Sequence, residues 1–580
     1  MHDIVIRNGN VVDGTGGAAR VADVVIDGST IVAVESRWSG SARRTIDAGG
    51  LLVTPGFVDV HTHYDAQVSW DPWLTPSSWH GVTTAVMGNC GVGFAPVEAD
   101  RHEWLIELME GVEDIPGSAM SEGIRWNWRS FPEYLDDVEA QQRVLDIGTQ
   151  VPHGPIRGFV MGDRGAANEA ATPEDISAMA ELVEQGLRAG ALGFSSSRTP
   201  IHRSKSGELV PGTRAAADEL LGIGDALRRA GHGVFQFAPE HINLPTVEWG
   251  WMTALARRSG RTVSVNLNQS DDGPEVWRDV LRLLDEARAN GVPIRAQAAG
   301  RSIGVLMCLH GSLHPLLFHP AYAEVAHLPM PDRLAALAGA ERRRRIIEGV
   351  PDDGGLFAKV VLDRTPRMYP VVGSNIDYEP SADQSVKALA ESRGVAPMQV
   401  ILEQLVGDDG RGMLYLPFFN YAYGDLSFTH ALQQHPSTTM GLSDAGAHCG
   451  AICDGGMPTF MLTHWTRDRA RGPLLPLEHV VARQTSRTAE LYGLQDRGVL
   501  APGYRADVNI IDYERLGFDV PSMAFDLPGG ARRLVQRGFG YRATLCRGVQ
   551  TVSDDEFTGE LPGRLIRGPK PSPGAIRPPT

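Results

Sequence analysis

The sequence predicts an α/β protein, a (β/α)8 barrel of the TIM type with a small β-sandwich domain formed by both chain termini. Residues 1–55 have the pattern of short strands separated by turns, such as Asn8-Gly9-Asn10. From residue 56, apolar β-rich runs alternate with helix-like stretches, which is typical of βα units around a buried parallel sheet. From about Gly498 the short-strand pattern returns, so the two ends are expected to share one domain.

Eight apolar runs are candidates for the barrel strands. They are residues 57–60, 83–87, 156–161, 191–194, 234–237, 263–267, 293–296 and 438–442. Between several of them, residues 172–189, 215–229 and 275–290 repeat apolar side chains at helical spacing. This alternation favours a barrel, in which functional residues follow the carboxyl ends of the strands.

The domain boundaries follow from these patterns. We expect a β-domain from residues 1–55 and 486–568, and a catalytic barrel over 56–485. The stretch 313–404 is too long for an ordinary βα connection and predicts an inserted subdomain near the site. Residues 569–580 are rich in proline and are expected to form an extended tail.

Composition and charge exclude several classes of function. The net charge of −16 would repel nucleic acid and anionic membrane surfaces, so neither is an expected partner. The first residues lack a basic segment followed by an apolar run, and no later run is long enough to span a membrane, so a cytoplasmic protein is expected. Five scattered cysteines do not suggest a disulfide framework.

The strongest chemical signal is the apolar run that ends in His61-Thr62-His63. Alternation along a strand puts His61 and His63 on one face, where both imidazoles can bind one metal ion at the barrel mouth. The alternative is a pair of solvated histidines after a strand. The position at the end of a predicted strand favours the metal site.

Three segments carry a resemblance to a known family: residues 46–63, the motif Gly88-Asn89-Cys90-Gly91-Val92-Gly93, and Gly503-Tyr504-Arg505-Ala506-Asp507. Together they resemble the amidohydrolase superfamily, and specifically its D-aminoacylase (N-acyl-D-amino-acid deacylase) branch. The resemblance covers most of the chain. It implies a metal-bearing (β/α)8 barrel flanked by a small β-domain built from both chain ends.

Many members of that superfamily bridge two metal ions with a carbamylated lysine on strand four. The lysines here are Lys205, Lys359, Lys387 and Lys570, and the nearest, Lys205, lies in a polar loop. A thiolate at the end of strand two can fill the same electrostatic role, and Cys90 has that position. The alternative is that Cys90 is a buried structural thiol.

Asp444 follows the last predicted barrel strand. The resemblance implies that it binds the metal and acts as the catalytic acid and base, accepting a proton from water and delivering it to the leaving amine. A carboxylate beside a cation stays ionised, which suits this role. The alternative is that Asp444 only caps a turn before Ala445-Gly446.

The sequence departs from the branch at strands five and six, where the resemblance implies two more metal-binding histidines. Gln236 and Asn268 stand there instead, and a neutral amide oxygen is a poor zinc ligand. Glu240, His241 and His448 are candidates for additional metal or substrate contacts. The expected cofactor is a divalent metal, zinc by preference, as one or two ions.

Two arginines are candidates for binding a substrate carboxylate, because a planar guanidinium pairs well with one. Arg198 follows the fourth predicted strand and Arg301 follows the seventh. Either side chain is equally explained as a surface or structural ion-pair residue. The arginine that the branch carries after the last strand has no clear match in residues 451–460.

The resulting hypothesis is a metal-dependent hydrolase of linear amides of the N-acyl-amino-acid or N-acyl-amine type, in which Asp444 shuttles the proton. Its partner is a small-molecule amide, and a homo-oligomer is left open. Two alternatives remain: a cyclic amidase or imidase that uses the same centre, and a degenerate scaffold that hydrolyses nothing.

Overall fold

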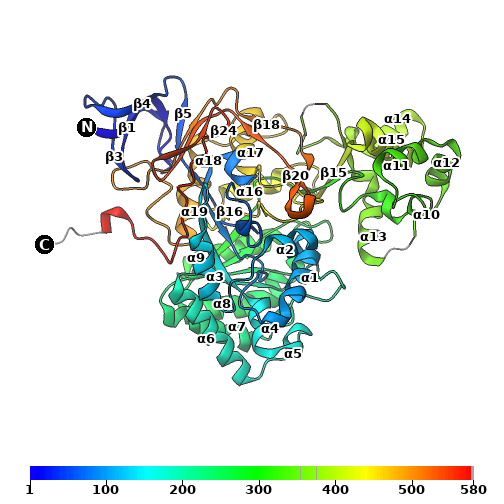
Figure 1. Cartoon of the computed structure of the whole chain (residues 1–580), viewed down its shortest axis with the longest axis horizontal. Coiled ribbons are helices and arrows are strands. Elements are labelled where there is room, and N and C mark those ends of the chain that lie inside the picture. The colour runs from blue at the N-terminus through cyan, green and yellow to red at the C-terminus, as the bar shows by residue number, and fades with distance from the viewer. Residues whose placement is uncertain (353–354, 374, 576–580) are drawn as a thin grey trace.

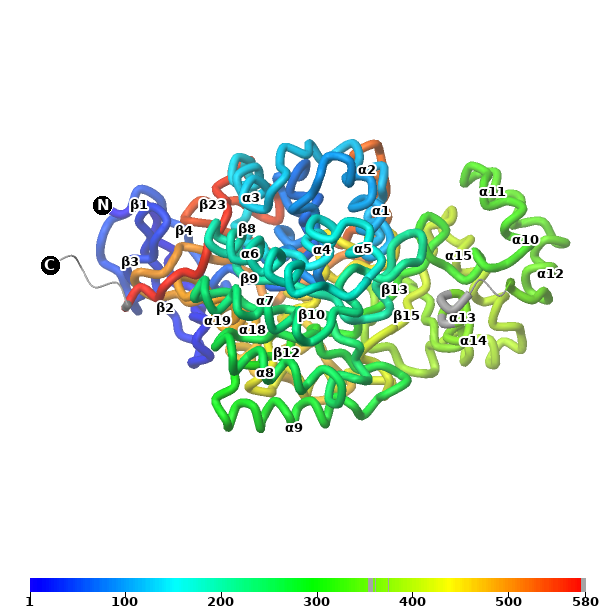
Figure 2. Tube along the Cα trace, turned by 90° about the horizontal axis from the view of Figure 1, so that it is seen from below, coloured from blue at the N-terminus to red at the C-terminus, as the bar shows by residue number. Residues whose placement is uncertain are grey.

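The computed structural model describes residues 1–580 except 353–354, 374 and 576–580. A central barrel separates two smaller parts, which lie at opposite ends of the molecule (Figures 1 and 2). One end carries the N-terminal strands and the other a group of short helices. None of the helices in the described ranges combines the length and apolarity that crossing a membrane requires.

Eight parallel strands form the barrel, in the order β16-β12-β11-β10-β9-β8-β7-β6. They are β6 (Phe57–Asp59), β7 (Val82–Met87), β8 (Asp146–Pro152), β9 (Gly193–Ser197), β10 (Val234–Ala238), β11 (Val263–Asn266), β12 (Ile294–Ala298) and β16 (Thr438–Met440). Past the ends of β6 and β16, the His63 amide donates to the carbonyl of Ala445 at 2.8 Å. The ring therefore closes just beyond its first and last strands, and the predicted barrel is confirmed.

One of the eight predicted strands is wrong. Residues 156–161 lie in α4 (His153–Met161), and the third strand is β8, which precedes that helix. A short apolar run fits a buried helix as well as a strand, so its periodicity did not decide between them. The true strand carries polar residues that bond inside the barrel, as when Gln150 Nε2 donates to Asn89 Oδ1 at 2.8 Å.

Helices surround the barrel, and the three predicted from their periodicity are present within two residues at each end. Those three are α6 (Pro173–Ala189), α7 (Ala217–Ala230) and α9 (Val276–Ala289). The others are α1 (His102–Glu113), α2 (Gly117–Gly123), α3 (Phe131–Ala140), α5 (Asp163–Ala166), α8 (Trp249–Ser259), α16 (Ser427–Gln434), α17 (Met457–Thr463), α18 (Leu477–Arg483) and α19 (Ser486–Leu491). Thr172 begins α6 with a capping box to Asp175.

Between β12 and β16 the chain forms a separate lobe over the mouth of the barrel. Its three-stranded sheet comprises β13 (Ile303–Met307), β15 (Met413–Phe419) and β14 (Tyr369–Val371). Its helices are α10 (Pro320–Ala323), α11 (Met330–Ala338), α12 (Ala340–Glu348), α13 (Gly355–Asp363), α14 (Val386–Arg393) and α15 (Pro397–Gly410). Buried residues from Val305 to Leu416 form their own apolar cluster. The range 313–404 lies within this lobe.

The β-domain is built from both chain ends, as predicted. The N-terminal strands are β1 (His2–Val11), β2 (Arg20–Asp27), β3 (Thr30–Glu35), β4 (Ala42–Asp47) and β5 (Leu52–Pro55). The C-terminal strands are β17 (Val508–Ile511), β22 (Tyr541–Cys546), β23 (Val549–Ser553) and β24 (Glu556–Phe557). Because β17 pairs antiparallel with β5, the two ends share one sheet. Two antiparallel pairs complete this region: the hairpin of β19 (Ser522–Leu527) and β20 (Ala531–Val535), and the pair of β18 (Gly517–Phe518) with β21 (Gly538–Phe539), which flank that hairpin in the chain. The predicted tail is described only to residue 575, and its last five residues lie outside the described part.

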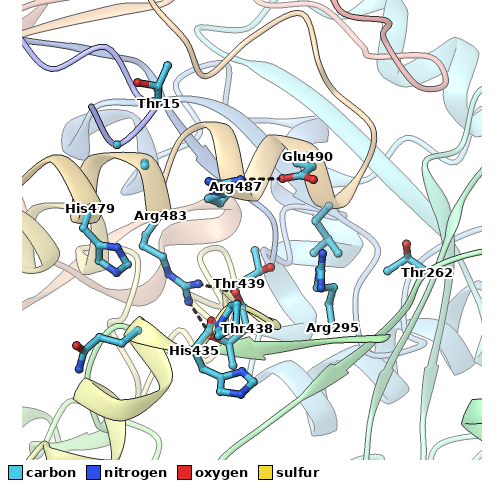
Figure 3. A pocket seen from close by; sticks show the side chains of 15 residues that line it. Thr15, Thr262, Arg295, His435, Thr438, Thr439, His479, Arg483, Arg487 and Glu490 are labelled. Atoms are coloured by element: carbon cyan, nitrogen blue, oxygen red, sulfur yellow. Dashed lines mark hydrogen bonds and ion pairs between the residues drawn. The ribbon is translucent and has the colours of Figure 1, made fainter. Parts of the chain in front are cut away.

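Polar residues surround the amino ends of the barrel strands. They line a cavity of about 440 Å³ beside the amino ends of β12 and β16 (Figure 3). Arg483 of α18 crosses it and donates from Nη2 to Thr438 Oγ1 at 3.0 Å, which holds the last strand to the helix. Because active sites of such barrels lie at the carboxyl ends of the strands, we expect the functional site at the opposite end from this cavity.

Asp146, the first residue of β8, joins the barrel to the C-terminal segment. Its buried carboxylate accepts from Arg497 at 2.9 Å and from Arg505 at 2.6 Å. It also accepts from the amide of Arg564 at 2.8 Å. One carboxylate thus fixes three separate parts of the C-terminal chain to one barrel strand.

We predict that Asp146→Asn destabilises the fold by about 3 kcal/mol, because it removes the buried carboxylate that Arg497 and Arg505 share and leaves each with only its second partner, Asp496 or Asp507. Urea unfolding followed by circular dichroism measures the change. Asp279→Asn, on the exposed face of α9, is the matched control and should change the free energy of unfolding by less than about 0.5 kcal/mol. Equal effects of both substitutions would contradict the assigned role of Asp146.

Candidate metal centre

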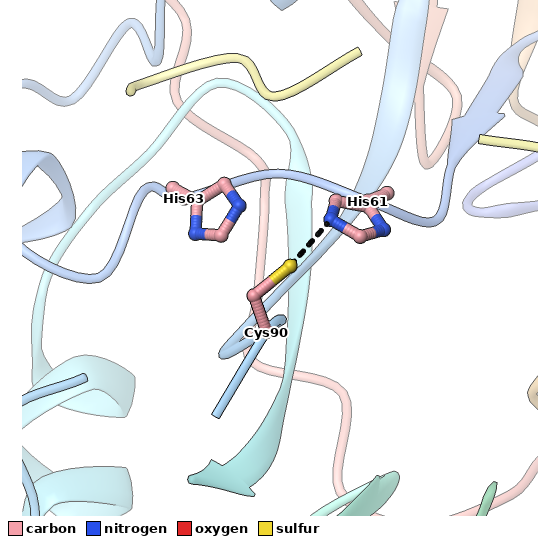
Figure 4. Close-up of side chains that lie close together, drawn as sticks. All are labelled: His61, His63 and Cys90. Carbon is pink, nitrogen blue, oxygen red and sulfur yellow. Dashed lines mark hydrogen bonds between the residues drawn. The ribbon is translucent and has the colours of Figure 1, made fainter. Parts of the chain in front are cut away.

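Two histidines and a cysteine converge at the carboxyl ends of the first two strands (Figure 4). His61 and His63 follow β6, and Cys90 follows β7. The sulfur of Cys90 lies 3.3 Å from Nε2 of His61, and one ligand atom from each of the three residues lies within 4.8 Å of the others. All three side chains are buried, so these donors face one another away from bulk water.

Asp444 joins this cluster from the other edge of the barrel sheet. Its Oδ1 lies 3.3 Å from Nε2 of His61 and 3.7 Å from Nε2 of His63. Its backbone amide donates to the carbonyl of His61 at 3.1 Å, so the contact that closes the barrel also positions the carboxylate. The four residues that the sequence suggested as a metal site therefore lie together.

The backbone at this site is strained. Cys90, Asp444 and His448 have φ angles of +56°, +46° and +51°, in the left-handed region that residues other than glycine rarely adopt. Such conformations persist only where the surroundings enforce them, and they concentrate at functional sites.

His61 is oriented by an amide that sequence analysis did not single out. Its Nδ1 lies 2.6 Å from Oε1 of Gln297, on β12. An amide oxygen only accepts, so Nδ1 carries a proton and Nε2 is the ring nitrogen directed at Cys90 and Asp444. Gln297 in turn donates to Ser264 Oγ at 3.0 Å. Contacts of this kind fix the tautomer and direction of a metal-binding histidine.

The charges at the site favour anionic donors beside the imidazoles. Burial alone raises the pKa of the Asp444 carboxyl, but the bond with His63 and the charge of His61 hold it well below its usual range. Burial also raises the pKa of the Cys90 thiol, and both histidines outweigh it, so that the pKa is lowered. A thiolate and a carboxylate are thereby favoured among the donors.

His61, His63 and Cys90 fit the ligand set of a small divalent cation, and Asp444 adds a carboxylate oxygen beside the two histidines. Tetrahedral sites with bonds of about 2.0–2.3 Å place neighbouring donors about 3.3–3.8 Å apart. The separations of 3.3 Å from His61 to Cys90, 3.3 Å from His61 to Asp444 and 3.7 Å from His63 to Asp444 lie in that range. Two nitrogens, one sulfur and one oxygen also match the ligand chemistry of zinc.

Strands five and six support the thiol rather than extend the donor set. Gln236 Oε1 accepts from the amide of Cys90 at 2.9 Å, and its Nε2 donates to Asn266 Oδ1 at 2.9 Å. Asn266 Nδ2 lies 3.7 Å from the Cys90 sulfur. The strand-six amide beside the cluster is therefore Asn266 and not Asn268, because β11 ends at Asn266.

The other candidates lie farther out. His241, Asn268 and His448 line the cavity above the cluster, and Asn268 Nδ2 lies 3.5 Å from Nε2 of His241. Glu240 accepts from Asn243 Nδ2 at 2.8 Å and is absent from the described cavity lining. Three of these four residues, His241, Asn268 and His448, thus line the cavity.

Neither candidate arginine reaches the cavity. Arg198 donates from Nε to both oxygens of Glu248, at 3.0 and 2.8 Å. Arg301 is fully buried, pairs with Asp454 at 2.9 Å and stacks on the ring of Tyr378. The structural ion-pair interpretation describes both side chains.

Glu113 is a site residue that sequence analysis missed. It ends α1 and is buried, with Oε1 3.3 Å from Nδ1 of His63 and Oε2 3.7 Å from Nε2 of His448. The acidic pair Glu113-Asp114 at a helix C-terminus opposes the helix dipole, and this unfavourable placement was the signal available in the sequence.

The cluster forms the floor of a cavity of about 390 Å³, a size that suits a small-molecule ligand. Its walls come from the loops after the barrel strands and from the lobe between β12 and β16. Lobe residues in the wall include Ile303, Val305, Val361, Leu416, Phe418 and Phe419.

Comparisons with known proteins agree with this architecture. A D-aminoacylase of Alcaligenes xylosoxydans xylosoxydans is 25% identical over 567 residues and is covered over 97% of each chain. A protein of Mycobacterium tuberculosis is 28% identical over 575 residues, which cover 92% of this chain and 89% of the relative. A crystal structure of a D-aminoacylase superposes with a TM-score of 0.64 at 23% identity, over 98% of this chain and 100% of the other, which shows the shared fold.

The resemblance to D-aminoacylases inferred from the three sequence segments is thereby confirmed. The model of the amidohydrolase family matches residues 44–552, a span that includes the whole barrel and all four residues of the cluster. This protein belongs to the amidohydrolase family.

Proposed function

We propose that this protein is a metal-dependent hydrolase that cleaves linear amide bonds of the N-acyl-amine or N-acyl-amino-acid type. The observation that carries the proposal is the convergence of His61, His63, Cys90 and Asp444 on the floor of a ligand-sized cavity. Membership of the amidohydrolase family and a D-aminoacylase among the relatives support the same reaction class.

His61, His63, Cys90 and Asp444 would hold one divalent ion, most simply zinc. When bound, such an ion supplies Lewis-acid polarisation of a carbonyl and activation of water. We favour a single ion because the amides of Gln236 and Asn266, which stand at strands five and six, are already bonded to Cys90 and to each other.

The side chains of the chain itself would manage the proton. Asp444 Oδ2 accepts the proton of the attacking water and delivers it to the leaving amine nitrogen, while Oδ1 faces His61 and His63. His61 stays in one tautomer because Gln297 holds Nδ1–H. Hydrolysis then consumes one water and yields a carboxylic acid and an amine.

Cyclic amides remain the competing substrate class, since the same centre would open a hydantoin ring. Parallel assays of N-acyl amines and hydantoins on the metal-loaded protein separate the two classes. We also propose that the protein acts in the cytoplasm, where a small soluble amide would be available as its substrate.

We predict that Asp444→Asn lowers kcat by about a thousandfold, because an amide cannot shuttle the proton. His61, His63 and Cys90 remain, so elemental analysis should find most of the metal still bound. Asp468→Asn, at an exposed position, is the control and should keep the wild-type rate. A fully active Asp444→Asn protein would refute the assigned role.

We further predict that Cys90→Ser weakens metal binding by about 10- to 100-fold, because a neutral hydroxyl replaces a thiolate ligand. Competition with a chromogenic chelator measures this affinity without reference to turnover. Cys308→Ser removes another buried thiol that lies outside the cluster and should leave the affinity unchanged. Equal affinities of wild type and Cys90→Ser would remove the thiol from the ligand set.

A further inference from the structure

The charges that line the cavity point to the chemistry of the substrate. Among the residues that the structure describes, no lysine or arginine lines this cavity. Four carboxylates do: Glu110, Glu113, Asp114 and Asp444. A substrate carboxylate would therefore meet like charges and no basic side chain of these two types, apart from any bound metal ion, and juxtaposed like charges are strongly unfavourable.

Two of the cations close to the cavity, Lys205 and Arg364, are paired with acids. Lys205 pairs with Glu110 at 2.9 Å from the solvent side. Arg364 pairs with Asp271 at 3.1 Å, its guanidinium lies 5.0 Å from the ring of Phe418, and it is not among the described lining residues. Arg532 acts electrostatically on Asp114 from β20 and is not part of the described lining.

Two histidines on the walls, His202 and His241, do not replace an arginine. Burial lowers the pKa of His202 and that of His241 to about 4 each, so both imidazoles are neutral near pH 7. His448 lies 3.7 Å from Glu113, which faces its Nε2. His202 and His241 therefore offer hydrogen bonds to an uncharged group rather than a positive charge to an anion.

One wall of the cavity is apolar and comes from the lobe. Ile303 and Val305 of β13 and Leu416, Phe418 and Phe419 of β15 face the cavity, and Val361 of α13 adds to them. Ile201, Leu442 and Ile452 extend the apolar surface around the barrel mouth. An alkyl or aryl group buried here gains about 25 cal/mol per Å² of apolar surface.

We propose that the substrate is an uncharged amide that carries an apolar substituent and has no carboxylate beside the scissile bond. The inference rests on the proposed hydrolysis and narrows it from acyl amino acids to N-acyl alkyl- or arylamines. The reaction consumes one water, breaks the C–N bond and yields a carboxylic acid and a free apolar amine. The lobe contributes specificity through its apolar wall and not through a charged clamp.

The test uses three probes that differ only at one group. N-hexanoyl-phenethylamine lacks the carboxylate, N-hexanoyl-D-phenylalanine carries it, and N-hexanoyl-D-phenylalaninamide has a neutral group of similar size in its place. We expect kcat/KM for the phenethylamine to exceed that for the acid by more than about tenfold, with the amide close to the phenethylamine. The amide probe separates charge from size.

Failure of this inference is distinguishable from failure of the proposed function. Metal-dependent cleavage of the acid at a rate equal to or above the phenethylamine would overturn the inference and leave the hydrolase intact. If no probe is cleaved, the hydrolase proposal fails, and calorimetric binding of the uncleaved probes decides the inference. Binding of the two uncharged probes but not of the acid would support it, whereas equal binding of the acid and the phenethylamine, or binding of neither, would overturn it.

A substitution at the wall provides an independent check. Ile452→Arg adds the missing cation, and Ile452→Met is the matched control of similar length without charge. We expect the arginine variant to raise the acid-to-phenethylamine ratio of kcat/KM by about tenfold relative to the methionine variant. An unchanged ratio would mean that charge at this wall does not set specificity.

Discussion

The closure of the barrel between its first and last strands is the interaction on which the rest of the structure depends. The Asp444 amide donates to the His61 carbonyl and the His63 amide donates to the Ala445 carbonyl, just past β6 and β16. These two backbone bonds complete the ring. They also bring Oδ1 of Asp444 within 3.3 Å of His61, so the contacts that close the ring also position Asp444 beside the other donors.

The site maintains unfavourable local conformations because the surrounding barrel enforces them. The left-handed backbone conformation at Cys90 and Asp444 costs free energy, so the same segments would not adopt it outside the folded barrel. Gln236 holds the Cys90 amide and Ser443 donates from Oγ to the His61 carbonyl at 3.0 Å, so each strained segment is tied to a neighbouring strand. The side-chain amides of Gln236, Asn266 and Gln297 on strands five, six and seven thus position the metal-binding residues Cys90 and His61.

The sequence was sufficient for the architecture where each element carried a local signal. Periodicity located α6, α7 and α9, and strand alternation with the His61-Thr62-His63 motif located the site at the barrel mouth. The third strand was missed because β8 carries the polar Gln150, whose Nε2 donates to Asn89 Oδ1, a partner that the local sequence does not reveal. Glu113, Gln297 and Asn266 were missed for a related reason: their roles depend on partners far away in the chain.

X-ray absorption spectroscopy of the zinc-loaded protein tests the central claim most directly, because it reports the atoms bound to the ion. We predict one sulfur at about 2.3 Å together with nitrogen and oxygen neighbours at about 2.0–2.2 Å and the multiple-scattering signature of imidazole. A first shell of oxygen alone, with neither sulfur nor imidazole, would show that His61, His63 and Cys90 do not hold the metal.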